Sequence, residues 1–202
     1  MSIEELIQSG FLESYAIGDI TDADRRVVDN AIKKHPELAQ ELRAIEYALE
    51  TYAFAHAIEP ADTEKPMLFA VLDFNNRMKA GESQSTVPAL QPGSLITDYS
   101  IWLNRAELQE PFSYDIMHGY IIAATEAKTT LIVWLKEGAP DEIHTDEYET
   151  FLIVEGTCDI VVGAKRNSLK AGDVFSIPLH INHRVEVTSD IRCKVILERR
   201  AA

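Results

Sequence analysis

Two stretches decide the fold: EIHTDEYETFLIVEG at residues 142–156 and GDVFSIPLHINH at residues 172–183. In the first, imidazole and carboxylate side chains precede an apolar strand that ends at a glycine. In the second, a glycine, a proline and another imidazole follow in order. Two neighbouring strands can bring such groups into one pocket. Neutral imidazole and carboxylate groups together suit a divalent transition metal.

The two stretches resemble the two motifs of the cupin family, a small double-sheet β-barrel. The first family motif is a glycine, five residues, His-x-His, three or four residues, a Glu, six residues and a glycine. The second is Gly, five residues, Pro-x-Gly, two residues, His, three residues and Asn. The positions that fit are Glu149, Gly156, Gly172, Pro178 and His183. His180 replaces the usual second glycine of the second motif, and Val187 replaces its usual Asn.

Only one histidine stands where the family has His-x-His, so two registers are open. If Glu142 takes the first place, His144 takes the second, and four residues separate it from Glu149, a gap that the family allows. If His144 takes the first place, Asp146 takes the second; the gap is then too short, but Gly138 fits the leading glycine. We prefer the first register. The resemblance implies a divalent ion (Zn, Fe, Mn or Ni) held by His144, Glu149 and His183, with Glu142 as the fourth ligand and Asp146 as its alternative.

Composition limits the class of protein. The chain has 202 residues, of which 46% are hydrophobic, and a net charge of -14 from 33 acidic and 19 basic residues. Such a surface repels phosphate backbones, which argues against direct binding of nucleic acid. No apolar run is long enough to span a bilayer, and the start lacks the pattern of a secretory signal, so we expect a cytoplasmic protein. In that compartment Cys158 and Cys193 are expected as free thiols.

The first 79 residues predict four helices. Thr21, followed by Asp24 three residues later, is typical of a helix start. His35 precedes Pro36, which predicts that one helix ends and the next begins there. Beyond this point apolar residues recur in steps of four and three, which predicts an amphipathic helix. They are Leu38, Leu42, Ile45, Leu49 and Tyr52.

The remaining chain predicts a linker and a β domain. Residues 80–93 are rich in Gly, Ser, Gln and Pro and read as a flexible linker. From residue 94 onward, short β-branched and aromatic runs alternate with turns, beginning with residues 100–103 as a first strand candidate. We therefore expect an α+β chain of two domains: a four-helix domain at residues 1–79, the linker at 80–93, and a cupin β-barrel of the jelly-roll type at 94–202.

The helical part resembles the N-terminal domain of bacterial anti-sigma factors. The matching stretches are GFLESYAIG at residues 10–18, the capped helix after Thr21, and HPEL at residues 35–38. In zinc-binding members a His-x3-Cys-x2-Cys cluster spans the end of that helix. Here Ala31, His35 and Leu38 take those three places, so this zinc site is absent. Together with a cupin, such a domain resembles the ChrR type of anti-sigma factor.

The resemblance implies a regulator of transcription in a stress response. The helices would hold an extracytoplasmic-function sigma factor, and the cupin would respond to a small molecule or an oxidant, without contact with nucleic acid or membrane. An alternative is a metal-dependent cupin enzyme, dioxygenase-like or isomerase-like, whose helices serve oligomerisation; a metal-free binding module is a third, and a homodimer stays open. No catalytic residue beyond the metal ligands is indicated, which favours the regulator over the enzyme.

Overall fold

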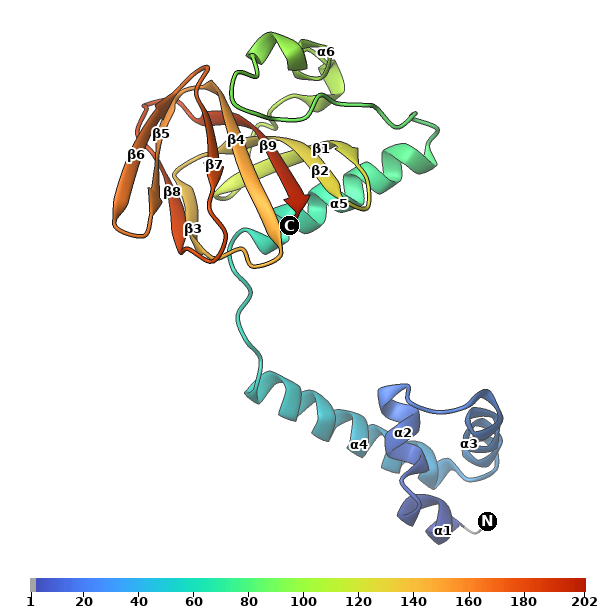
Figure 1. Ribbon diagram of the computed structural model, residues 1–202. Coiled ribbons are helices and arrows are strands. Elements are labelled where there is room, and N and C mark those ends of the chain that lie inside the picture. Colours follow the sequence, from blue (N-terminus) through green and yellow to red (C-terminus); the bar gives the residue numbers. More distant parts are fainter. Residues whose placement is uncertain (1–2) are drawn as a thin grey trace. The chain divides into compact units, whose positions relative to one another are not determined.

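The computed structural model describes residues 3–202 and consists of two compact units (Figure 1). The first unit ends at Glu59 and the second runs from Pro60 to Ala202. The division therefore falls about twenty residues before the boundary that the sequence predicted. Among the described residues, no helix combines the length and the apolar character that crossing a membrane requires.

The described part of the first unit, residues 3–59, contains four helices. They are α1 (Ile3–Gln8), α2 (Phe11–Ile17), α3 (Asp22–Lys34) and α4 (Pro36–Ala55). One fully buried side chain from each helix forms the centre of their core: Leu6, Leu12, Val28 and Leu38. Because only short helices surround this centre, the core is small and lies against the N-terminal half of α4.

Local signals set the helix boundaries as expected. The hydroxyl of Thr21 accepts a hydrogen bond from the backbone N–H of Asp24 at 3.2 Å and caps α3. Pro36 is the first residue of α4, where its missing N–H costs no hydrogen bond. Gly10 separates α1 from α2 with a φ of 79°, a left-handed conformation that glycine adopts without strain.

Helix α5 (Glu64–Lys79) belongs to the second unit, although the sequence grouped it with the first helices. Met67, Ala70 and Phe74 lie on one face of α5 and join the core of the β domain. Arg77 fixes this position, because its guanidinium donates a hydrogen bond to the carbonyl oxygen of Ile121 at 2.6 Å. Periodicity reveals that a helix has an apolar face, but it does not reveal which surface that face covers.

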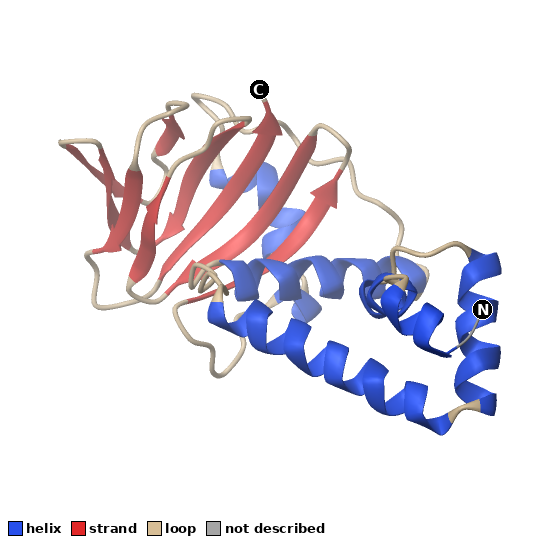
Figure 2. Ribbon diagram, turned by 90° about the horizontal axis from the view of Figure 1, so that it is seen from below, coloured by secondary structure: helices blue, strands red, loops and turns tan. Residues whose placement is uncertain are grey.

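Within residues 3–202, nine strands form two antiparallel sheets. The sheets pack face to face as a jelly-roll barrel (Figure 2). The first sheet has the order β1-β2-β9-β4-β7 and the second the order β3-β8-β5-β6. The strands are β1 (Met117–Ala124), β2 (Lys128–Leu135), β3 (Gly138–Glu142), β4 (Glu147–Glu155), β5 (Thr157–Val162), β6 (Lys165–Lys170), β7 (Val174–Ile177), β8 (His183–Val187) and β9 (Cys193–Ala201).

The strands at the centre of the five-stranded sheet are buried on both faces. In β4, Phe151 and Ile153 point into the barrel, whereas Leu152 and Val154 belong to a second cluster on the outer face of the sheet. Residues 87–108 cover that outer face, which explains why these strands read as continuous apolar runs. The barrel therefore has an inner core between its sheets and an outer core beneath a covering segment.

The covering segment corrects two expectations. Residues 80–93 are not a free linker, because Val87 and Leu90 are buried in the outer core and the backbone N–H of Leu90 donates to Glu198 Oε2 at 3.0 Å. Residues 100–103 are not a strand but the helix α6 (Ser100–Leu103), placed between the 3-10 helices η1 (Ile96–Tyr99) and η2 (Ala106–Leu108). Trp102 packs into the same core from α6.

Candidate metal centre

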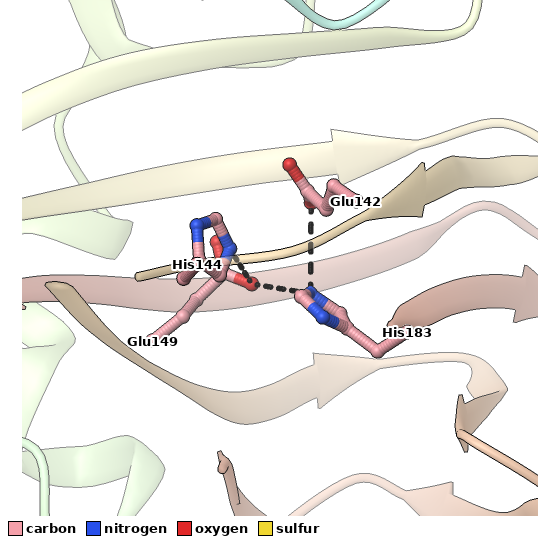
Figure 3. Close-up of side chains that lie close together, drawn as sticks. All are labelled: Glu142, His144, Glu149 and His183. Atoms are coloured by element: carbon pink, nitrogen blue, oxygen red, sulfur yellow. Dashed lines mark hydrogen bonds and ion pairs between the residues drawn. The ribbon is translucent and has the colours of Figure 1, made fainter. Parts of the chain in front are cut away.

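Four polar side chains converge at one end of the barrel interior (Figure 3). Glu142 is the last residue of β3, and its backbone pairs with His183, the first residue of β8. Glu149 lies near the start of β4 in the other sheet, and His144 lies in the loop that joins β3 to β4. Each of the four residues offers one ligand atom, and these atoms lie within 4.8 Å of one another.

The geometry centres on one carboxylate oxygen. Glu149 Oε2 lies 3.3 Å from His144 Nε2 and 3.3 Å from His183 Nε2. Glu142 Oε1 lies 3.8 Å from the same nitrogen of His183. The side chains of Glu149 and His183 are almost completely buried, whereas that of Glu142 is partly exposed. The cluster is therefore a buried polar site with one side open toward solvent.

Arg199, on β9, lies against both carboxylates. Its Nε donates a hydrogen bond to Glu149 Oε1 at 2.9 Å, and its Nη2 lies 3.7 Å from Glu142 Oε2. A third carboxylate, that of Glu147, lies 3.5 Å from Nη1. The buried charge of Glu149 is therefore compensated by a guanidinium, as a buried carboxylate requires.

The surroundings change the protonation of these groups. Burial alone would raise the pKa of Glu149, but the two imidazoles and Arg199 hold that pKa well below its usual range. Burial, with the nearby charge of Glu149, raises the pKa of Glu142. The adjacent Glu149 carboxylate raises the pKa of His144. One carboxylate is thus firmly ionised, whereas the other would ionise more readily beside an additional cation.

The donor set fits a divalent transition metal. His144 Nε2 is buried and, among the described residues, has no hydrogen bond of suitable alignment, although Glu149 Oε2 is near. The Nδ1 atoms of His144 and His183 face acceptor oxygens, those of the Glu147 carboxylate at 3.6 Å and the Ile181 carbonyl at 3.4 Å. With the proton on Nδ1, both Nε2 lone pairs point to the centre of the cluster, as in metal-binding histidines.

The structure brings together the four residues that the sequence singled out as ligands. Asp146, the alternative to Glu142, lies outside the cluster, and its backbone oxygen accepts a hydrogen bond from Ala202 at 2.9 Å. His180 is exposed in the loop between β7 and β8, with a φ of 62°. Sequence reasoning missed Arg199. A signal was present, because residues 193, 195 and 197 of β9 face the barrel interior and residue 199 continues that alternation.

Two hollows adjoin the cluster. A cavity of about 20 Å³ lies inside the barrel, and its lining includes Glu142, Glu149 and Arg199 together with Thr63 and Met67 at the start of α5. This volume has room for about one water molecule. An open groove of about 530 Å³ lies between α5 and the turn that joins β1 to β2. Arg199 and Met67 line both hollows and so stand between them.

Comparison with known proteins identifies the domain that carries this site. Residues 130–197 match the family model of the cupin domain. The matched stretch contains all four converging residues, and the chain therefore carries a cupin domain. The match does not extend to the helices of the first unit. No curated protein matches the chain significantly.

Several solved structures resemble part of the chain. One is the cupin domain of Schizosaccharomyces pombe Cnp3, at 15% identity and a TM-score of 0.42, covering 44% of this chain and 67% of that one. Another is KdgF from a Halomonas species, at 19% identity and a TM-score of 0.41, covering 46% of this chain and 89% of that one. A third is a predicted oxalate decarboxylase from Thermotoga maritima, at 19% identity and a TM-score of 0.40, covering 43% of this chain and 81% of that one.

Proposed function

We propose that this chain is a two-domain anti-sigma factor of the cytoplasm. Its first helices sequester an extracytoplasmic-function sigma factor, and its cupin domain is the sensor or regulatory module for a small-molecule or oxidant signal. A divalent transition metal (Zn, Fe, Mn or Ni) is held in the cupin domain by Glu142, His144, Glu149 and His183. The class of partner comes from the resemblance of the helices to anti-sigma domains, and the metal from the convergence of the four side chains.

The observation that carries the proposal is the apolar stripe of α4, which continues beyond the core of the first unit. Leu38 is fully buried and Ile45 partly buried against α1 to α3. Further along the same stripe, Leu49 is 38% exposed and Tyr52 is 65% exposed. A helix that exposes apolar side chains at this spacing is suited to pack against a helix or groove of a partner.

The second half of α4 carries more exposed apolar surface than its stripe alone. Tyr47 and Phe54 are also exposed, and Ile58 beyond the helix is 92% exposed. Residues 1–59 contain 12 acidic and 5 basic side chains. An apolar surface on an acidic unit suits a basic partner, such as a protein that binds DNA, because complementary charge steers association.

The size of the inner cavity argues against an enzyme that acts on an organic substrate, and it limits a signal sensed there to a small oxidant. An organic substrate needs a pocket of roughly 300 Å³ or more. The cavity beside the four side chains holds only about 20 Å³. The alternative of a metal-dependent cupin enzyme would require a substrate to approach from outside this cavity, either from the side on which Glu142 is partly exposed or from the outer groove, across Arg199 and Met67.

The partner is tested by co-expression with a sigma factor encoded beside this chain. We expect the two proteins to elute together from a sizing column and Tyr52→Ser to abolish the complex. Phe112→Ser is the matched control, because Phe112 is a fully exposed aromatic side chain of the second unit. Separate elution of the wild-type proteins, or equal loss of binding in both variants, would contradict the proposal.

The metal is tested by elemental analysis of the purified protein and by anomalous X-ray scattering, which locates and identifies an ion. We expect about one ion per chain in the wild-type protein and almost none in His183→Ala, because the site loses an imidazole ligand. A wild-type content well below one ion per chain, even after incubation with Zn²⁺, would remove the metal from the proposal.

A further inference from the structure

The two carboxylates of the metal centre share one arrangement. Each directs one oxygen toward an imidazole, both imidazoles for Glu149 and that of His183 for Glu142, and the other oxygen toward Arg199. For Glu149 the distances are 3.3 Å from Oε2 to both imidazole nitrogens and 2.9 Å from Oε1 to Arg199 Nε. For Glu142 they are 3.8 Å from Oε1 to His183 and 3.7 Å from Oε2 to Arg199 Nη2.

From this arrangement we infer that Arg199 is the positioning residue of the metal centre. Arg199 holds the oxygen of Glu149 and the oxygen of Glu142 that point away from the imidazoles. Each carboxylate is thereby presented to the ion through its other oxygen alone. The inference rests on the metal site of the proposed function. It assigns no contact between Arg199 and the ion itself.

The chemistry of arginine suits this task. The guanidinium is planar and always charged, and its five N–H groups point in fixed directions, so one side chain can bind several carboxylates at once. Arg199 uses Nε, Nη1 and Nη2 for three different carboxylates, those of Glu149, Glu147 and Glu142. A lysine at this position would keep the charge, but it would offer one compact ammonium group instead of a fork.

The location of Arg199 at the edge of the barrel allows its side chain to stay charged beside the buried site. Arg199 lines both the inner cavity and the outer groove, and its side chain is 22% exposed. Partial contact with water lowers the cost of holding a guanidinium there, while its inner edge reaches the buried Glu149. A positive charge also repels a bound cation, so the two effects oppose each other. We expect the gain in affinity from positioning to exceed the loss from charge repulsion. The hydrogen bond from Arg199 to Glu149 is short, and Oε2 of Glu149 already faces both imidazoles.

The test measures Zn²⁺ affinity by calorimetry for the wild-type protein, Arg199→Gln and Arg199→Lys. Arg200→Gln is the matched control, because it removes the same charge from the neighbouring residue of β9, which is exposed and lies over the Tyr148 ring. We expect affinity to fall by about 10- to 100-fold in Arg199→Gln, as for other residues that support metal ligands. Arg199→Lys should lose less, and Arg200→Gln should match the wild-type protein.

A second measurement separates positioning from general support of the fold. The visible absorption spectrum of the Co²⁺-loaded protein reports the ligand geometry, and we expect it to change in Arg199→Gln but not in Arg200→Gln. Wild-type-like affinity and spectrum in Arg199→Gln, or tighter binding, would overturn this inference and leave the metal site standing. A wild-type protein that binds neither Zn²⁺ nor Co²⁺ would overturn the metal site and this inference together.

Discussion

Replacing Glu149 by glutamine removes the buried charge at the centre of the site while keeping the shape of the side chain. The carboxylate is 1% exposed, accepts a hydrogen bond from Arg199 at 2.9 Å and lies 3.3 Å from two imidazoles. Breaking a buried charge pair costs about 3–5 kcal/mol, because the remaining partner loses its compensation. Arg199 keeps Glu142 and Glu147 as neighbours, so we expect the lower end of this range, about 3 kcal/mol, for the metal-free protein.

The assay follows tryptophan fluorescence during urea unfolding in the presence of a chelator. Both tryptophans, Trp102 and Trp134, lie in the second unit, so the signal reports that unit alone. A loss of about 3 kcal/mol corresponds to a fall of about 1–3 M in the urea midpoint, because stability falls by about 1–3 kcal/mol for each M of urea. Adding Zn²⁺ at about 100 times the dissociation constant of the wild-type protein should stabilise that protein by about 2.7 kcal/mol. The same Zn²⁺ concentration should stabilise Glu149→Gln by much less, because the variant binds the ion more weakly.

Glu147→Gln is the matched control for this prediction. It removes the same charge and also lies near Arg199, at 3.5 Å, but its side chain is 34% exposed. Solvent screens such a pair, so we expect a loss of about 0.5 kcal/mol. If Glu149→Gln is as stable as Glu147→Gln without metal, the buried charge does not hold this end of the barrel together, and the reasoning from burial and distance is refuted.

Three further changes test other parts of the fold. A hydrogen bond from Arg105 holds the pKa of Glu82 below its ordinary value of 4.5. The Glu82 carboxylate therefore stabilises the fold above pH 4.5, and this stabilisation is lost as the pH falls through the lowered pKa. We expect Glu82→Gln to remove this dependence, so that urea midpoints fall less steeply toward acid pH than in the wild-type protein. Leu12→Ala should cost the first unit about 3 kcal/mol and melt helical circular dichroism, while tryptophan fluorescence of the second unit stays unchanged. Gly138→Ala should lower the fluorescence-detected stability by at least about 2 kcal/mol, because Gly138 has a φ of 145° and an added Cβ would overlap the carbonyl of Val185; an unchanged urea midpoint would contradict this.

The amino-acid sequence alone was enough to predict the barrel domain and the residues of the candidate site. Glycine, proline, imidazole and carboxylate at motif spacing were enough to predict a cupin domain and to name the four residues that converge. The choice between Glu142 and Asp146 needed coordinates, because both registers satisfied part of the motif. Strand pairing places Glu142 in the cluster, where it faces His183 across β3 and β8, whereas Asp146 lies beyond the end of β3.

Periodicity and composition determined which faces are apolar, but they did not determine what covers those faces. The sequence predicted a fourth helix within the first 79 residues, yet only the tertiary structure assigned that helix, α5, to the barrel, where Met67 and Phe74 pack. The stretch at residues 80–93 has the composition of a loop, but two of its residues, Val87 and Leu90, are buried in the outer core. Arg199 joined the site because alternation along β9 turns it inward beside Glu149, from fifty residues away in the chain. Local sequence specifies conformation and polarity over a few residues, whereas contacts between distant segments arise only when the whole chain packs.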